Sequence, residues 1–308
     1  MAESSALRAA LSSSVVGRRR ETELVLAALA ADRHVLLEGP PGTGKSTLLR
    51  AVAQGLGIGF AFVEGNAELT PARLVGHFDP ARVLTDGYSP EVFVDGPLVT
   101  AMRDGSLLYV EEINRVPEET LNVLITVMSE GELHVPRLGS VTAGAGFKLV
   151  AAMNPFDAVG TARISGAVYD RVCRVAMDYQ PAGEEASIVE RQCDGALDRA
   201  FVASAVDMVR RTRSHPDLRV GSSVRGAVDF AKVACSLADL RGTSLADADT
   251  SLDAALVALS GRVRVREGSM RTSEDIVTEI WREVFGRTTD GESGEGKATA
   301  PTRGTTSR

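Results

Sequence analysis

Short apolar runs, separated by helical or loop-rich stretches, dominate the first part of the chain. They lie at residues 34–38, 60–63, 107–110, 147–153 and 172–177. Continuous apolar runs of this length are typical of strands that are buried on both faces of a parallel sheet and joined by crossover helices. The pattern therefore predicts an α/β domain over residues 1–181.

The pattern changes after Pro181. Residues 184–208 and 224–240 are each predicted to form one helix, with no strand signal of comparable strength. A further helix is indicated by apolar residues at three- or four-residue spacing, namely Leu252, Leu256, Leu259 and Val263. We therefore expect a small helical domain over residues 182–285.

The last residues differ in composition from both domains. Residues 286–308 consist mainly of Gly, Thr, Ser and charged side chains. Such a segment buries too little apolar surface to offset the entropy of ordering its backbone. The sequence therefore predicts a disordered tail here.

A glycine-rich segment, Gly39-Pro-Pro-Gly-Thr-Gly-Lys-Ser46, lies between the first apolar run and a helical stretch at residues 47–54. It matches G-x-x-x-x-G-K-[ST] in full and in the strand–loop–helix context that this phosphate-binding motif requires, which favours nucleotide binding over a turn without a ligand. Backbone N–H groups would surround the phosphates, Lys45 adds positive charge, and the Ser46 hydroxyl can ligate Mg²⁺. The expected nucleotide-binding residues are Gly39, Pro40, Pro41, Gly42, Thr43, Gly44, Lys45, Ser46 and Thr47.

Two carboxylates, Glu111 and Glu112, end the apolar run that begins at Leu107. In a doubly wound sheet the carboxyl ends of the strands face the ligand crevice. We therefore expect Glu111 to hold Mg²⁺ through its water shell and Glu112 to orient and polarise the attacking water. The alternative is that the pair merely starts a solvated helix.

Three further segments carry a resemblance to a known family. Gly96-Pro-Leu98, Leu107-Leu-Tyr-Val-Glu-Glu-Ile-Asn-Arg-Val-Pro117 and Ala152-Met-Asn-Pro155 resemble the MoxR group of AAA+ ATPases, relatives of the magnesium-chelatase ATPase subunit. The similarity covers residues 15–281. It implies an α/β fold, in which a P-loop NTPase AAA+ core with a parallel sheet is followed by a small all-helical lid domain, and it implies ATP and Mg²⁺ as cofactors.

The resemblance also implies roles for residues outside the phosphate motif. Gly17, in Val15-Val-Gly-Arg18, resembles part of the segment that packs against adenine. Asn154 matches the sensor-1 residue, Arg171 the arginine finger that acts on a neighbouring subunit's nucleotide, and Arg225 the sensor-2 arginine of the lid. Ordinary turns and solvated surface arginines are the alternatives. The implied catalytic residues are Glu112, Asn154, Arg171 and Arg225.

One position departs from the family, because Glu111 stands where relatives usually carry Asp. The extra methylene moves the carboxylate by roughly 1 Å, which would slow hydrolysis if the metal–water geometry were disturbed. Residues 132–146 resemble a hairpin inserted before sensor 1, which would face the ring axis. Residues 64–97 resemble an insert-bearing region that contacts partner proteins, with an irregular surface loop as the alternative.

Composition and charge argue against several classes of protein. Hydrophobic residues make up 44% and charged residues 24% of the 308 residues, as in ordinary folded proteins. The net charge of −7 argues against a general nucleic-acid coat. The three cysteines are too scattered for a disulfide framework, which favours a reducing compartment. No window approaches the roughly 18 apolar residues of a membrane span, so we expect a cytoplasmic protein without a membrane partner.

The motifs predict a Mg²⁺-dependent ATPase. The resemblance to MoxR proteins implies that it forms a homo-oligomer, a hexameric ring, and remodels a client protein or inserts a metal or cofactor into it. The resemblance also implies a partner with a von Willebrand factor A domain. One alternative is a nucleotide-gated binding module that hydrolyses little ATP. A nucleic-acid motor or loader is less consistent with the acidic charge.

Overall fold

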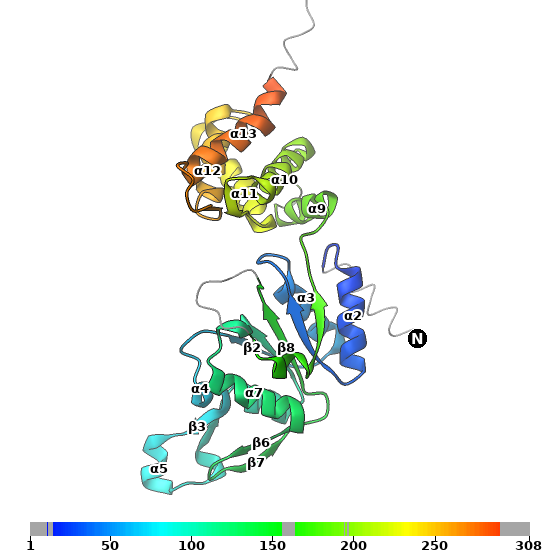
Figure 1. The fold of residues 1–308 in the computed structure, drawn as a ribbon, viewed down its shortest axis with the longest axis vertical. Coiled ribbons are helices and arrows are strands. Elements are labelled where there is room, and N and C mark those ends of the chain that lie inside the picture. The colour runs from blue at the N-terminus through cyan, green and yellow to red at the C-terminus, as the bar shows by residue number, and fades with distance from the viewer. Residues whose placement is uncertain (1–10, 12–14, 156–163, 194, 196, 290–308) are drawn as a thin grey trace, which may run out of the picture. The chain divides into compact units, whose positions relative to one another are not determined.

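The computed structural model describes residue 11 and residues 15–155, 164–193, 195 and 197–289 (Figure 1). The chain divides into two compact units, Met1–Pro181 and Ala182–Arg308. Each unit has its own apolar core.

A five-stranded parallel sheet forms the centre of the first unit. Its strands are β1 (His34–Glu38), β2 (Phe60–Glu64), β5 (Leu107–Glu111), β8 (Lys148–Met153) and β9 (Val172–Ala176). Their spatial order is β2-β5-β8-β1-β9, and every neighbouring pair is parallel. The five apolar runs are therefore confirmed as strands, and β8 lies between the strand that leads into the phosphate motif and the strand that ends at Glu111.

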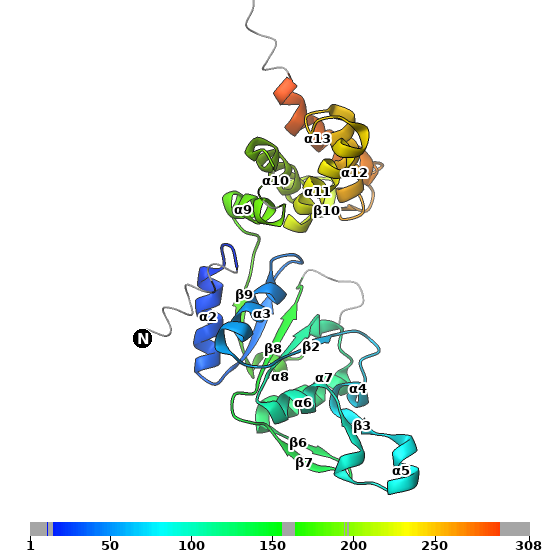
Figure 2. The ribbon, with the colours of Figure 1, turned by 180° about the vertical axis from the view of Figure 1, so that it is seen from behind.

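Helices cover both faces of this sheet (Figures 1 and 2). The helices α2 (Arg19–Ala30) and α3 (Lys45–Leu56) share a core with one set of strand side chains, which includes Leu107 and Tyr109. The helices α6 (Pro97–Asp104) and α7 (Glu118–Glu130) share a second core with the alternate positions, which include Leu108 and Val110. Because successive side chains of a strand point to opposite faces, Glu111 lies on the α3 side.

Two excursions extend from the sheet. The first comprises α4 (Pro71–Val75), β3 (Gly76–Phe78), α5 (Pro80–Asp86), the 3₁₀ turn η1 (Pro90–Val92) and β4 (Phe93–Asp95), with β3 and β4 antiparallel. The second is the antiparallel hairpin of β6 (Glu132–Val135) and β7 (Gly139–Thr142). The hairpin expected within residues 132–146 is thus present, and residues 64–97 form regular elements rather than an irregular loop. Two short elements, η2 (Ile113–Arg115) and α8 (Gly166–Tyr169), complete the unit.

The second unit is mainly helical. Its helices are α9 (Ala182–Gln192), α10 (Arg199–Ser214), α11 (Val224–Arg241), α12 (Ala248–Leu259) and α13 (Ser273–Thr289). The prediction of one continuous helix over residues 184–208 is wrong, because the chain breaks between α9 and α10. Gly195, in this break, has a φ of 66°, a left-handed conformation that glycine adopts without steric cost. A short antiparallel pair, β10 (Leu218–Val220) with β11 (Arg264–Val265), was not predicted.

The last helix also extends beyond the predicted domain end. Residues 286–289, which the composition placed in the tail, continue α13 as far as Thr289. The aromatic ring of Phe285 packs against Phe201, Phe230 and Trp281 with centroid distances of 5.8, 5.9 and 5.9 Å, so apolar contacts hold the helix close to its end. The rest of the predicted tail, residues 290–308, lies outside the described residues. Of the helices that the structure describes, none is long and apolar enough to cross a membrane.

Candidate active site

The phosphate motif forms a tight loop between the end of β1 and the start of α3. Gly42 and Gly44 have φ values of 75° and 83°, left-handed conformations that favour glycine. The Lys45 side chain is 8% exposed, and its Nζ donates hydrogen bonds to the carbonyl oxygens of Gly39 at 2.8 Å and Pro40 at 2.9 Å. The Thr43 hydroxyl also donates to the Pro40 carbonyl, at 2.9 Å. The loop is therefore held in a curved shape by its own side chains.

Gly39 is required for a different reason from Gly42 and Gly44, namely close packing against the backbone after β9. A Cβ at this position would lie 2.2 Å from the carbonyl oxygen of Met177, directly after β9. The backbone of the loop can therefore pass the end of β9 only because residue 39 has no side chain.

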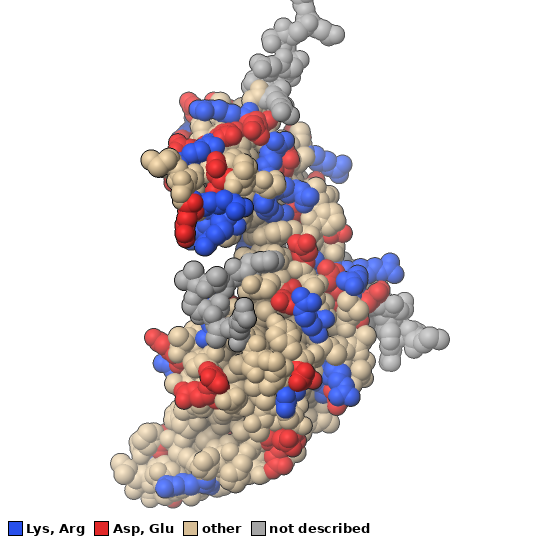
Figure 3. Space-filling model, viewed as in Figure 1, with Lys and Arg blue, Asp and Glu red and all other residues tan. Residues whose placement is uncertain are grey.

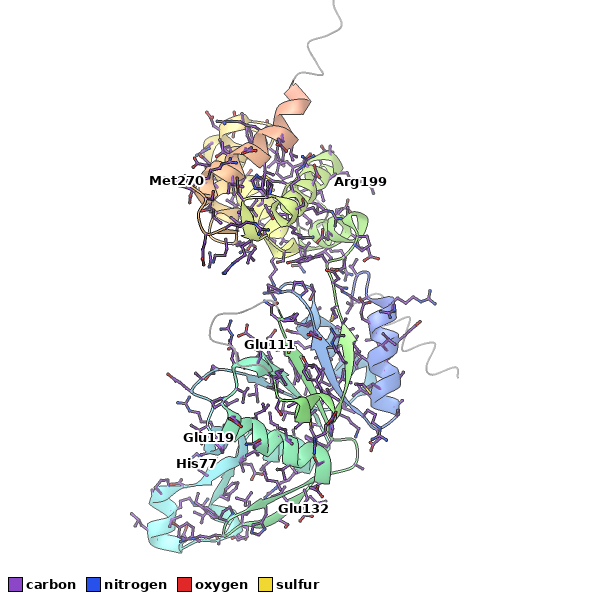
Figure 4. The ribbon with its side chains drawn as sticks, in the orientation of Figure 1. His77, Glu111, Glu119, Glu132, Arg199 and Met270 are labelled. Atoms are coloured by element: carbon purple, nitrogen blue, oxygen red, sulfur yellow. The ribbon has the colours of Figure 1, made fainter. Side chains whose placement is uncertain are left out.

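Ser46 and Glu111 come together at the N-terminus of α3. The Ser46 hydroxyl donates a hydrogen bond of 2.9 Å to Oε1 of Glu111, which lies 65 residues later in the chain. Glu111 is at the carboxyl end of β5, near the phosphate loop (Figure 4). The structure thus joins the two residues that the sequence predicts as metal ligands.

These donors fit magnesium. Mg²⁺ prefers oxygen ligands, keeps several waters and is usually held by one or two protein oxygens together with substrate phosphates. A hydroxyl and a carboxylate that meet beside a phosphate loop are such a set. Within the part of the chain that the structure describes, no group of three or more His, Cys, Asp or Glu side chains could hold a metal ion instead.

Tyr109 is a further residue at this position, and it is not among the residues that the sequence predicts for the site. Its side chain is fully buried, and its hydroxyl lies 3.2 Å from Oγ of Ser46. Burial raises the pKa of the Tyr109 phenol above its usual value, so the hydroxyl is protonated at neutral pH. The only sequence signal was a polar-tipped side chain two positions before Glu111, and thus on the same face of the strand.

Glu112 leaves the strand in a different direction. Its φ and ψ are 52° and 45°, a left-handed conformation that costs energy for any residue other than glycine. Its carboxylate pairs with Nε of Arg115 at 2.8 Å, and both side chains are 39% exposed. The pair Glu111–Glu112 therefore does not continue directly into a long helix, because η2 separates it from α7.

Asn154 follows β8 and is half-buried. In the register of the sheet, the preceding residue Met153 pairs with Glu38, and its carbonyl oxygen accepts a hydrogen bond of 3.2 Å from the Gly39 N–H. Asn154 is thus at the same edge of the sheet as the phosphate loop and Glu111.

Arg171 lies at the opposite edge of the sheet. It directly precedes β9, whose first residue Val172 pairs with His34 at the start of β1, whereas the phosphate loop follows the end of β1. At a rise of about 3.3 Å per residue, the strand separates these two edges by roughly 15 Å. Nη1 of Arg171 donates to the Ala167 carbonyl at 2.8 Å, and Nε donates to the Ser129 hydroxyl. The structure therefore does not bring Arg171 to the phosphate loop of its own chain.

Arg171 also lines a cavity of about 760 Å³ at this edge. The amino ends of β1, β8 and β9 contribute to the lining through His34, Lys148 and Val172. Burial lowers the pKa of His34 below its usual value, so the imidazole is neutral at pH 7.

The last predicted residue, Arg225, belongs to the second unit. It is exposed and lies in the first turn of α11, directly after Val224. Charged side chains of both signs cover the visible face of this unit (Figure 3).

The segment around Gly17 contacts the phosphate loop through its neighbour Arg18. Gly17 forms a turn with a φ of 67°, and the Arg18 side chain is only 4% exposed. The guanidinium donates to the carbonyl oxygens of Thr43 at 3.2 Å and Asp178 at 2.6 Å, and to Oε1 of Glu21 at 2.7 Å. The sequence around Arg18 predicts no role for its side chain, because the partner Asp178 lies 160 residues further along the chain.

Part of the chain is similar to a known family of domains. Residues 34–172 match the model of the AAA domain, dynein-related subfamily. The uncharacterized protein YeaC of Bacillus subtilis is 28% identical over 247 residues, which cover 71% of this chain and 74% of the relative. The gas vesicle ATPase GvpN2 of Halobacterium salinarum is 28% identical over 276 residues, which cover 84% of this chain and 77% of the relative.

Solved structures share the fold at low sequence identity. A candidate ATPase from Cytophaga hutchinsonii has a TM-score of 0.53 and 17% identity, covering 92% of this chain and 94% of that protein. The RuvB Holliday junction branch migration motor of Thermotoga maritima has a TM-score of 0.52 and 19% identity, covering 79% of this chain and 70% of that protein. The chain therefore has the P-loop AAA fold, and residues 34–172 are the part that matches the AAA domain model.

Proposed function

We propose that this protein is a Mg²⁺-dependent ATPase of the MoxR type, which hydrolyses ATP in a homo-oligomeric ring and uses the energy to remodel a client protein. The observation that carries the proposal is the junction of Ser46 with Glu111 at 2.9 Å, beside a complete phosphate loop. Asn154 leaves the neighbouring strand at the same edge of the sheet.

Each residue has a role that follows from its chemistry. Lys45 and the loop N–H groups stabilise the phosphate charge. Ser46 and Glu111 would hold Mg²⁺, which when bound would supply positive charge beside the phosphates. Glu112, once its carboxylate exchanges Arg115 for a water molecule, orients that water towards the γ-phosphate.

The place of Arg171 supports the proposal of a ring. Arg171 precedes β9 at the edge of the sheet opposite its own phosphate loop, so we propose that its guanidinium serves the nucleotide of a neighbouring subunit. The finer parts of this proposal that rest on the resemblance to MoxR proteins are a hexamer, a partner with a von Willebrand factor A domain, and metal or cofactor insertion as the form of remodelling. A cytoplasmic location is also proposed, and it rests on the few, scattered cysteines of the sequence.

A second candidate is a nucleotide-gated binding module with little hydrolysis. It is favoured by the ion pair between Glu112 and Arg115, which occupies the expected water-orienting carboxylate. The longer side chain of Glu111, where MoxR relatives usually carry Asp, also favours slow hydrolysis. A nucleic-acid motor has weaker support, because the net charge is −7 and the likeness to RuvB concerns the fold.

The Glu112→Gln variant separates the two candidates. We expect it to bind ATP as the wild type does but to release phosphate at least about 10²-fold more slowly, since an amide cannot polarise water as a carboxylate does. Glu119→Gln, which removes the same charge from an exposed position in the first turn of α7, is the matched control and should keep full activity. Wild-type protein that binds ATP but releases no phosphate with Mg²⁺ would establish the binding module instead.

A further inference from the structure

Three oxygen atoms meet where the metal site is proposed, and one of them belongs to Tyr109. The Ser46 hydroxyl is 2.9 Å from Glu111 Oε1 and 3.2 Å from the Tyr109 hydroxyl. Tyr109 and Glu111 are two positions apart on β5, so both side chains leave the same face of the sheet, towards α3. The contact is therefore built into the strand and does not depend on a mobile loop.

The aromatic ring of Tyr109 is held firmly. The side chain has no exposed surface, and its ring lies 5.9 Å from the ring of Phe60 and 5.6 Å from that of Phe62, measured between centroids. Phe62 is also its partner in the register of β2 with β5. The guanidinium of Arg50 packs over both phenylalanine rings, at 5.1 and 5.7 Å. The hydroxyl at the tip of Tyr109 consequently has a fixed position.

The number of protons and lone pairs on the Ser46 hydroxyl determines whether Tyr109 donates or accepts in their contact. Ser46 has one hydroxyl proton, which it donates to Glu111, so in the contact with Tyr109 the tyrosine donates and the Ser46 oxygen accepts. One further lone pair of the Ser46 oxygen then remains for a metal ion. The Tyr109 hydroxyl thus determines the direction in which Ser46 presents that lone pair.

Residue 111 is a glutamate, and its longer side chain needs more contacts to hold the carboxylate in one position. A glutamate side chain has one more rotatable bond than an aspartate, so more side-chain entropy is lost when its carboxylate is held in one place. The Ser46 hydroxyl donates to the Glu111 carboxylate, and the Tyr109 hydroxyl contacts Ser46 and also interacts with the Glu111 side chain.

We propose that Tyr109 is a positioning residue for Mg²⁺, whose buried hydroxyl fixes Ser46 and, through it, the carboxylate of Glu111. The inference rests on the proposed nucleotide and metal site and adds to it the residue that sets its geometry. A defect at Tyr109 should therefore affect the metal-dependent part of nucleotide binding and leave the metal-independent part unchanged.

The test is the affinity for a fluorescent ADP analogue (mant-ADP), measured in EDTA and over a titration with Mg²⁺. For Tyr109→Phe, we expect affinity in EDTA within about twofold of wild type and a gain on adding Mg²⁺ that is about 5- to 10-fold smaller, as for loss of one buried hydrogen bond. Tyr109→Met, which also lacks the hydroxyl, should show the same selective loss. Tyr88→Phe removes an exposed hydroxyl from the first excursion and is the matched control.

A double-mutant cycle with Ser46→Ala then tests the route of the effect. If Tyr109 acts through Ser46, Tyr109→Phe should cause no further loss in the Ser46→Ala background. An unchanged Mg²⁺ effect in Tyr109→Phe overturns the proposal, and so does an equal loss of affinity with and without Mg²⁺, or loss of binding in EDTA by both Tyr109 variants.

Failure of the proposed function gives different results. Wild-type protein that binds no mant-ADP in either condition removes the nucleotide site and this inference with it. Wild-type protein that binds with a Mg²⁺-dependent gain but does not hydrolyse ATP removes only the ATPase, and the selective loss in Tyr109→Phe is still expected.

Discussion

The buried guanidinium of Arg18 donates a hydrogen bond of 3.2 Å to the carbonyl oxygen of Thr43, at the centre of the phosphate loop. A second nitrogen of the same group donates to the carbonyl oxygen of Asp178, which follows β9 near the end of the first unit. One side chain therefore links the N-terminal turn, the phosphate loop and the segment that leads to the second unit. The planar guanidinium permits this, because its donors point in several fixed directions.

Replacing Arg18 by Lys should weaken nucleotide binding although the charge is kept. An ammonium group on a flexible stem cannot satisfy the separate carbonyl partners of Arg18 at once. Loss of one or two buried hydrogen bonds predicts about 5- to 50-fold weaker affinity for mant-ADP, with a lower midpoint of thermal unfolding. The neighbouring Arg19, whose side chain is 85% exposed, provides the control variant Arg19→Lys. Equal affinities in the two variants would show that the Arg18 contact does not support the loop.

Lys45→Ala should abolish detectable ATP binding and leave the fold intact. The lysine supplies positive charge to the phosphates, and its bonds to the Gly39 and Pro40 carbonyls also maintain the loop. We expect affinity to fall by at least about 10²-fold, with an unchanged far-ultraviolet circular dichroism spectrum. Lys232→Ala, at an exposed position on α11, should bind as the wild type does. A folded Lys45→Ala variant with unchanged affinity would rule out the phosphate-loop assignment.

The second unit depends on a buried carboxylate. Glu185 is 2% exposed and accepts hydrogen bonds from Nη1 of Arg210 at 3.1 Å and Nη2 of Arg213 at 2.7 Å. Removing it leaves the charge of Arg213, which is only 13% exposed, without this partner. We therefore expect Glu185→Ala to lower the free energy of unfolding of this unit by about 3–5 kcal/mol.

Urea denaturation followed by circular dichroism would measure that loss. The control is Glu190→Ala on the same helix, whose carboxylate is 37% exposed and 3.8 Å from Arg199, and which should cost less than about 1 kcal/mol. A similar midpoint for both variants would show that the buried pair contributes no more than an exposed one.

The features that the sequence predicts well are local. The strands of the sheet are continuous apolar runs, and the phosphate loop is a contiguous motif, so neighbouring residues carry the whole signal. Glu111 and Asn154 were also identifiable, because each follows directly after such a run, and the ends of parallel strands meet at one edge of the sheet.

The features that the sequence does not predict depend on contacts between residues far apart in the chain, or on the backbone conformation of one residue. Tyr109 meets Ser46 across 63 residues, and Arg18 meets Asp178 across 160 residues. The break between α9 and α10 occurs where Gly195 adopts a left-handed conformation, within a stretch whose side chains have helical character. The strands β10 and β11 are very short, so neither produces a periodic pattern.

The position of Arg171 leads to a prediction about assembly. Its guanidinium contacts Ala167 and Ser129 at the edge of the sheet opposite the phosphate loop. If it acts on a neighbour's nucleotide, specific ATPase activity should rise with protein concentration as subunits assemble. Arg171→Ala should lower turnover by on the order of 10³-fold, as for other arginines that stabilise phosphoryl transfer in trans. Arg103→Ala, at an exposed position on α6, should have little effect.

Mixing two inactive variants tests the trans arrangement directly. An Arg171→Ala subunit has an intact phosphate loop but lacks the arginine, whereas a Lys45→Ala subunit offers the arginine but binds no ATP. At an interface where the first supplies the loop and the second supplies Arg171, a complete site forms, so mixtures should recover part of the wild-type rate. An arginine that served its own subunit would give mixtures no more active than either variant alone. That result, together with a rate independent of concentration and a monomer by sedimentation in ATP and Mg²⁺, would contradict both the arginine finger and the ring.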